Sequence, residues 1–213
     1  MKTDALIETL SDGVAPVAAN AAIRTLALGL GAGALVSALT MMAWLGVRPD
    51  LSDAMATGGY WMKFFYTLLF ACFGFWTLAR LARPGLRVDA QAVLELLPLV
   101  AIASMAGMRL GQAPADARMA LLMGASHDVC PWRIAALSVP VFIGVFWSMR
   151  RLAPTRPALA GAAAGLLAGA AGAFIYAFHC DESAAPFVAV WYTFGIALVG
   201  AAGGLLGRWA LRW

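Results

Sequence analysis

Six long apolar stretches, separated by short polar or basic segments, constrain the fold of this chain more than any other feature. Each is close to the roughly 20 residues that a helix needs to cross the hydrocarbon core of a bilayer. They cover residues 25–47, 60–81, 91–108, 133–150, 157–178 and 184–207. We therefore predict an all-α fold, a polytopic membrane helical bundle with six transmembrane helices. Because the second and fourth stretches are short at their most apolar, a count of five is the alternative.

The composition excludes an ordinary soluble domain. Hydrophobic residues make up 62% of the 213-residue chain and charged residues 12%, whereas soluble domains average about 45–50% and about 25%. No loop is long enough to hold a separate soluble domain. The net charge of +4 is explained by basic cytoplasmic loops, so we expect a lipid bilayer around the chain and no direct contact with nucleic acid.

The distribution of lysine and arginine predicts the orientation. With the N-terminus inside, ten of the 15 basic residues fall on the cytoplasmic side and five outside, which satisfies the positive-inside rule. We therefore predict that both termini are cytoplasmic. Lys63, near the start of the second stretch, is expected to extend to the membrane interface.

The first 23 residues form a short cytoplasmic segment ahead of the transmembrane domain, residues 24–213. Their acidic start does not resemble the basic start of a signal peptide, so we expect this segment to be retained. Residues 4–12 predict a helix with an apolar and an acidic face, too short to be stable alone. We expect it to dock on a partner through four residues: Asp4, Leu6, Ile7 and Leu10.

Glycines recur at four-residue spacing in the first, fifth and sixth apolar stretches. Such residues let helix backbones approach closely in a membrane, where no hydrophobic force drives helices together. The glycines are Gly29 and Gly33, then Gly161, Gly165 and Gly169, then Gly200 and Gly204. We expect them to pack helices within one bundle; homo-oligomerisation through one of these faces is the alternative.

Motifs of membrane enzymes are missing from the sequence. There is no Gly-x-Ser-x-Gly, His-Glu-x-x-His or Cys-x-x-Cys, and no histidine lies in the middle of a span to bind haem. We therefore predict that the chain is not an enzyme, and a thiol oxidoreductase ranks last. A small multi-pass transporter or metal exporter is the main alternative, supported only by Glu95 within a span.

Reactive side chains gather instead in two predicted outer loops, one with His127 and Cys130, the other with His179 and Cys180. Three interpretations remain open. A disulfide between the two cysteines could brace the loops, or it could form and break as a signal. Alternatively, all four side chains could bind zinc or a softer metal. Cys72, in the middle of a span, is expected to fill space.

Four segments of the sequence resemble the NrsF-type anti-sigma factors, six-span inner-membrane proteins of proteobacteria. The segments are the start Met-Lys-Thr-Asp-Ala-Leu-Ile, Cys130-Pro131-Trp132, His179-Cys180, and the block from Ala185 to Tyr192. The resemblance extends over the whole chain. It departs from better-known anti-sigma factors in lacking a sizeable cytoplasmic domain and a His-x-x-x-Cys-x-x-Cys motif.

The resemblance implies a function that composition does not reveal. Such proteins sequester an extracytoplasmic-function sigma factor at the bacterial inner membrane and release it under heavy-metal or oxidative stress. Two periplasmic cysteines are tied to sensing in the family, and they match Cys130 and Cys180. No cofactor is required, although zinc or another soft metal could occupy the cysteine and histidine cluster.

Overall fold

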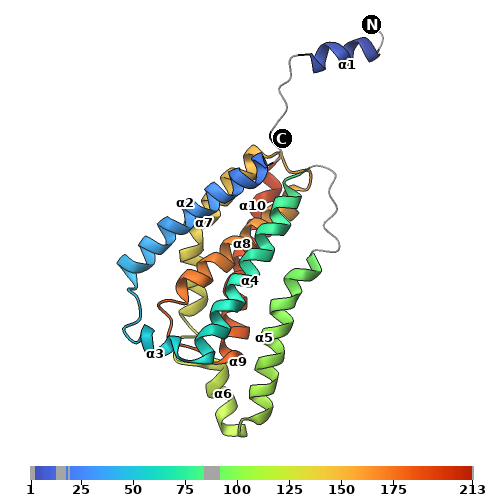
Figure 1. Ribbon diagram of the computed structural model, residues 1–213. Helices are drawn as coiled ribbons and strands as arrows, with labels where there is room; N and C mark the ends of the chain where they lie inside the picture. Colours follow the sequence, from blue (N-terminus) through green and yellow to red (C-terminus); the bar gives the residue numbers. More distant parts are fainter. Residues whose placement is uncertain (1–2, 13–17, 19, 84–91, 213) are drawn as a thin grey trace.

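The computed structural model describes residues 3–12, 18, 20–83 and 92–212, and every regular element in this part of the chain is helical. The elements are α1 Thr3–Ser11, α2 Ala21–Trp44, α3 Leu51–Met55, α4 Gly58–Leu81, α5 Ala92–Gln112, α6 Ala115–Met123, α7 Cys130–Arg151, α8 Pro157–Tyr176, α9 Ala185–Phe187, the π-helical turn η1 Val188–Tyr192, and α10 Thr193–Ala210. Figure 1 shows the long helices forming one elongated bundle.

Five helices are long and apolar enough to cross a membrane: α2, α4, α7, α8 and the continuous helix from Ala185 to Ala210. Each coincides with one of the expected spans. The third expected span lies on α5, whose apolar part, Leu96–Gln112, is a shorter apolar helix. The helical fold is therefore confirmed, with five candidate membrane spans, and the six-span count stays a prediction.

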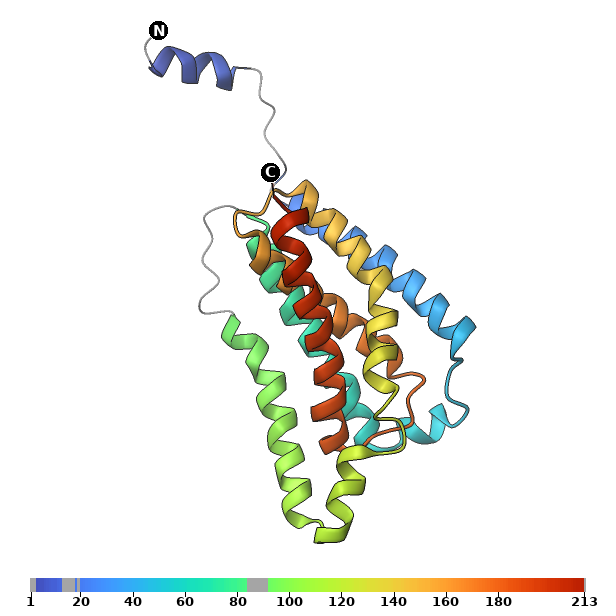
Figure 2. The same ribbon diagram turned by 180° about the vertical axis from the view of Figure 1, so that it is seen from behind.

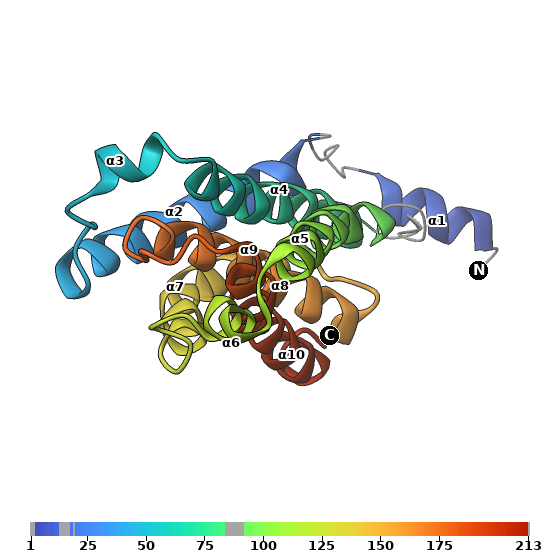
Figure 3. The ribbon, with the colours of Figure 1, turned by 90° about the horizontal axis from the view of Figure 1, so that it is seen from below.

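The path of the chain places two groups of helix ends at opposite ends of the bundle. Helices α2 and α8 finish where α4, α7 and α9 begin, and Figures 1 and 2 show these ends together. We call this the cysteine end, because Cys130 and Cys180 lie there. At the far end α2 begins and α10 finishes. Helix α5 runs along the bundle beside α4, with α6 at the cysteine end (Figure 3).

Helix α8 lies at the centre of the bundle and is the most buried of the five candidate spans. Its glycines face α10: a Cβ atom on Gly165 would overlap the backbone of Val199 and Gly200, and one on Gly161 would overlap Gly203. The predicted packing of helices through small residues is confirmed here. Close backbone approach gives these helices the van der Waals contacts that hold a bundle together in lipid.

Helices α2 and α7 form a second close pair. Gly29 lies against the backbone of Gly144, so neither position has room for a side chain. Two buried serines add hydrogen bonds between the helices: Ser37 Oγ donates to the Leu137 carbonyl at 2.6 Å, and Ser148 Oγ to the Thr25 carbonyl at 2.9 Å. These hydroxyls satisfy their own hydrogen-bonding needs while tying the helices together.

The last span differs from the single regular helix that the sequence predicts. A π-helical turn, η1, separates α9 from α10, and Trp191 in this turn donates from Nε1 to the Leu122 carbonyl at 2.9 Å. π-Helical turns frequently occur at functional sites, where they redirect side chains. Here the turn carries Tyr192 into the core at the cysteine end.

Candidate functional site: a thiol pair held by a buried lysine

Cys130 and Cys180 meet at the cysteine end of the bundle, although 50 positions separate them in the chain. Cys130 is the first residue of α7, and Cys180 lies in the loop of residues 177–184, which we call the Cys180 loop. Both thiols are free and buried, with 0% and 3% of their surface exposed. The two side chains influence each other's ionisation. Two thiols in contact are placed to form a disulfide or to react together with a thiol-seeking metal ion.

Lys63 of α4 lies beside this pair and is completely buried, with 0% exposure. Its Nζ donates to the Cys180 and Glu182 carbonyls, each at 2.7 Å, and lies 5.8 Å from the centre of the Tyr192 ring. The expectation that Lys63 extends to the membrane interface is therefore wrong. The side chain turns inward because the Cys180 loop offers two carbonyl acceptors at the start of α4.

The segment between α2 and α3 holds the Cys180 loop from another side. The backbone amide of Arg48 donates to the Phe178 carbonyl at 3.1 Å, and its Nη1 donates to the Cys180 carbonyl at 3.2 Å. Asp50 fixes the guanidinium group through a two-pronged contact with distances of 2.8 and 2.7 Å. The Arg48 guanidinium in turn lowers the pKa of Asp50, chiefly through these hydrogen bonds.

Glu182 and His179 join the Cys180 loop to further parts of the chain. Glu182 Oε1 accepts a hydrogen bond from the Ala125 amide at 2.6 Å. His179 Nδ1 lies 3.0 Å from the Gly46 carbonyl, and its Nε2 lies 3.5 Å from Arg133 Nη1. The Cys180 loop therefore connects α4, α7 and the segments before α3 and α7.

Two tyrosines close the cluster on the core side. Their rings lie 5.9 Å apart, and both side chains are almost fully buried: Tyr176 and Tyr192. The Tyr192 hydroxyl acts on the ionisation of Cys180. It has no hydrogen-bond partner within the described part of the chain.

The surroundings of Cys180 favour its thiolate. The neighbouring Cys130 thiol is the largest influence, and the positive charge of Lys63, the Tyr192 hydroxyl and a backbone amide act in the same direction against the opposing effect of burial. Together they lower the pKa of Cys180 to about 6. The thiolate is the reactive form toward oxidants and metals, so this sulfur is activated at neutral pH.

The four-residue metal set that the sequence left open as one alternative is not assembled among the described residues. Among the described residues no group of three or more cysteine, histidine, aspartate and glutamate side chains is placed to hold a metal ion. The His127 ring packs against Trp191, with 5.5 Å between ring centres, while His179 is engaged by Gly46 and Arg133. Other contacts thus engage both imidazoles.

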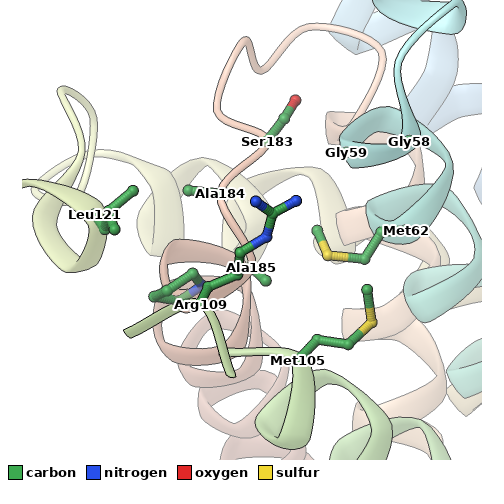
Figure 4. Close-up of a pocket in the computed structure, with 10 residues that line it drawn as sticks. Gly58, Gly59, Met62, Met105, Arg109, Leu121, Ser183, Ala184 and Ala185 are labelled. Carbon is green, nitrogen blue, oxygen red and sulfur yellow. The ribbon is translucent and has the colours of Figure 1, made fainter. Parts of the chain in front are cut away.

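A cavity of about 470 Å³ adjoins the Cys180 loop between α4 and α5. Figure 4 shows the Arg109 guanidinium pointing into it, beside the thioether groups of Met62 and Met105 and the backbone at Ser183. The cavity lies at the cysteine end of the bundle, where α4 begins and α5 ends.

The remaining residues singled out in the sequence lie away from this site. Helix α1 is exposed along its whole length, including Leu6, Ile7 and Leu10 at 41%, 59% and 69%. Its Asp4 is also exposed. Cys72 lies on the outer surface of α4 and takes no part in the pair. The side chain of Glu95 is outside the described residues.

Comparison of the sequence with known proteins identifies a family. The family described as negative regulator of sigma F, NrsF, matches residues 10–213. The chain belongs to the NrsF family. This is a family of regulatory proteins and not of enzymes, as the missing catalytic motifs led us to expect.

Two curated relatives match the NrsF-family chain over its full length and theirs. The probable anti-sigma-F factor NrsF of Azospira oryzae is 42% identical over 213 residues, covering 100% of both chains. The anti-sigma-F factor NrsF of Caulobacter vibrioides is 37% identical over 215 residues, again covering 100% of both. No solved structure matches the chain.

Proposed function

We propose that this chain is a membrane-bound anti-sigma factor that holds an extracytoplasmic-function sigma factor at the bacterial inner membrane. The observation that carries this proposal is membership of the NrsF family over residues 10–213, together with two full-length relatives named as anti-sigma-F factors. Helices of membrane-spanning length agree with a protein that keeps its partner at a bilayer.

In this proposal the chain crosses the membrane six times, with both termini in the cytoplasm. Helix α4 ends at one end of the bundle and α7 begins at the other, so the chain must pass along the bundle between them. Helix α5 is the element that makes this passage. Its 21 residues extend about 31 Å at 1.5 Å per residue, close to the thickness of the hydrocarbon core.

The sigma factor docks on α1 in this account. The apolar residues Leu6, Ile7 and Leu10 are exposed in the described chain, as a docking face requires. An amphipathic helix of this kind buries its apolar face in a groove of its partner. Asp4 would add negative charge toward the basic surface that a sigma factor uses to bind DNA.

Release follows a chemical change at the Cys130–Cys180 pair, which this orientation places on the periplasmic side. Oxidative stress would remove two electrons and two protons from the thiols and form a disulfide, with the electrons and protons passing to the oxidant. Heavy-metal stress would displace the thiol protons by a soft metal ion. Either event changes the charge and spacing of the pair where the Cys180 loop meets α4 and α7.

Co-purification tests the class of partner. The tagged full-length protein and a form lacking residues 1–12 are purified from the organism's own membranes without stress, and bound proteins are identified. We expect a sigma factor on the full-length protein and at least tenfold less on the shortened form. A triple variant, Leu6→Ala with Ile7→Ala and Leu10→Ala, should lose the partner similarly, whereas Thr9→Ala on the same helix should keep it.

Two outcomes would contradict the proposal. Absence of any sigma factor from both forms would remove the anti-sigma function. Equal amounts on both forms would preserve that function and exclude α1 as the docking segment.

A further inference from the structure

We infer that Lys63 is the residue that couples the Cys130–Cys180 pair to α4 and through it to the opposite end of the bundle. The inference rests on the proposed function, because it states how a change at the thiols reaches the partner-binding side. Lys63 does not itself react with the signal; it is a positioning residue that acts through the Cys180 loop.

The first support is the position of the charge. A fully buried lysine is rare, and it is retained only where partners compensate the loss of water. Lys63 has two carbonyl acceptors, and none of the described carboxylates lies within the 4.0 Å of an ion pair. The thiol pair and Asp181 are therefore the sources of negative charge around the ammonium group.

Every element packed around Lys63 contributes to this balance. The titratable and charged groups facing it are Cys180 and Asp181 from the Cys180 loop, Cys130 from α7, Arg48 from the segment before α3, and Tyr192 from η1. Arg48 is the other cation of this group, and Asp181 and the Cys180 thiolate are its anions. Cys180 is the member of this group whose charge a redox reaction abolishes.

The second support is the geometry of the connection. Lys63 lies in the second turn of α4, and its two hydrogen bonds reach both Cys180 and Glu182, so one side chain clamps the centre of the Cys180 loop. Gly59, one turn earlier, has Ser183 against its face. From Lys63, α4 continues for 18 residues to Leu81, about 27 Å at 1.5 Å per residue.

Disulfide formation changes both the charge beside Lys63 and the geometry of the Cys180 loop. The bond draws the two Cβ atoms to about 3.8 Å, which moves the Cys180 carbonyl that Lys63 holds. It also converts a thiolate and a thiol into a neutral group and so removes the negative charge beside a buried cation. The Cys180 loop and the start of α4 must then shift relative to each other. Because α4 is a continuous helix packed on α8, the shift is transmitted along it.

The test compares the chain with Lys63→Met, which keeps the length of the side chain without its charge or hydrogen bonds. Membranes containing the full-length protein and its sigma factor are treated with diamide, whose N=N bond accepts the two electrons and two protons of the thiols. Disulfide formation and retained sigma factor are measured in the same sample. We expect oxidation to release at least tenfold more sigma factor from the unmodified protein, and less than twofold more from Lys63→Met despite its disulfide.

Three further variants separate the coupling of the thiol pair to α4 from a role in which a cation only holds the Cys180 loop in place. Lys63→Arg keeps the charge and should preserve release within threefold. Arg48→Met removes the other cation on the Cys180 carbonyl but leaves the link to α4, and should keep at least half of the release. Arg109→Met, a cation on α5 with no contact to the pair, should behave as the unmodified protein does. Equal loss of release in Arg48→Met and Lys63→Met would overturn the special role of Lys63.

A second measurement does not depend on the sigma factor. The rate at which iodoacetamide alkylates Cys180 is measured against pH, with the site identified by peptide mass spectrometry. We expect the midpoint to rise by at least one pH unit in Lys63→Met and to return toward the original value in Lys63→Arg, which a purely steric role would not produce. If Lys63→Met does not accumulate in membranes, Lys63→Gln retains hydrogen-bond donors without the charge and serves in its place.

The outcomes distinguish a failure of the proposed function from a failure of the inference about Lys63. An unmodified protein that binds no sigma factor contradicts the proposed function, while the alkylation profile still tests Lys63. A Lys63→Met protein that forms its disulfide and releases sigma factor as readily as the unmodified protein contradicts the inference alone.

Discussion

At the scale of single residues, the reactivity of this protein is concentrated in one buried cluster. The Cys130 thiol, the charge of Lys63 and the hydroxyl of Tyr192 all act on the Cys180 sulfur, and two cations hold the Cys180 carbonyl. The sequence predicted that the cysteines could meet, because both fall in loops at one end of the bundle. It did not predict Lys63 or Arg48, because hydrogen bonds to the carbonyls of a distant loop leave no pattern in the sequence.

The lowered pKa of Cys180 predicts an unusual pH dependence of its alkylation. Because the pKa is lowered to about 6, the thiolate persists as the pH falls from 8 to 7 and is lost only near pH 6. In a Cys72→Ser background, we expect the rate of reaction of Cys180 with iodoacetamide to have its midpoint near pH 6.

Cys130→Ala removes the largest cause of this shift and provides the matched comparison. The midpoint should then rise by at least one pH unit. A midpoint near the ordinary value of about 8.5 in both proteins would show that the thiol pair does not activate Cys180.

At the scale of the elements, glycine positions determine how the helices pack. The prediction from four-residue spacing holds for α8 and α10, because backbone contact is a local consequence of missing side chains. The same pattern could not separate closely packed from looser positions: Gly204, which belongs to it, makes only ordinary contact with Ala162, whereas its neighbour Gly203 lies against the backbone of Gly161. Only the arrangement of the partner helix decides between them.

Substitution of glycine tests this packing with an internal control. Gly165→Leu places a large side chain against the backbone of α10, and overpacked cores typically lose about 1–3 kcal/mol or more. We expect at least a threefold loss of folded protein in membranes, measured by size-exclusion chromatography after mild detergent extraction. Gly31→Leu, which meets open space, should accumulate normally; equal loss in both variants would contradict the packing described here.

The π-helical turn and α6 are two elements that the sequence pattern did not predict. Pro186 lies in the first turn of this last helix, where proline is tolerated, and nothing else in the apolar run from residue 184 to 207 predicts η1. The turn depends on tertiary contacts, including the hydrogen bond from Trp191 to Leu122 of α6. The sequence predicted a loop in the region of α6, because nine residues without a clear apolar face do not indicate a helix.

At the scale of the whole molecule, the number of membrane crossings decides which side each end faces. Five helices satisfy the length and hydropathy of a span, and α5, with a shorter apolar part, runs along the bundle beside them. The positive-inside distribution and the six apolar stretches both favour an even number of crossings. Apolarity alone could not settle α5, because its apolar part is shorter than the other five.

Labelling of single cysteines tests the crossing of α5. In a background without native cysteines, Asp116→Cys before α7 and Arg212→Cys after α10 are exposed to a membrane-impermeant maleimide in spheroplasts. Six crossings predict that residue 116 is labelled and residue 212 is protected until the membrane is opened. Protection of 116 with labelling of 212 would mean that α5 does not cross.

The central claim is that the state of the Cys130–Cys180 pair controls retention of a sigma factor. The most direct measurement is the amount of sigma factor held per protein chain in isolated membranes, with the pair first reduced and then oxidised by diamide. We expect at least a tenfold decrease on oxidation, equivalent to about 1.4 kcal/mol of binding free energy. Cys130→Ser and Cys180→Ser should insert normally and retain the sigma factor under both conditions. Release from either serine variant to the same extent as from the unmodified protein would contradict the claim.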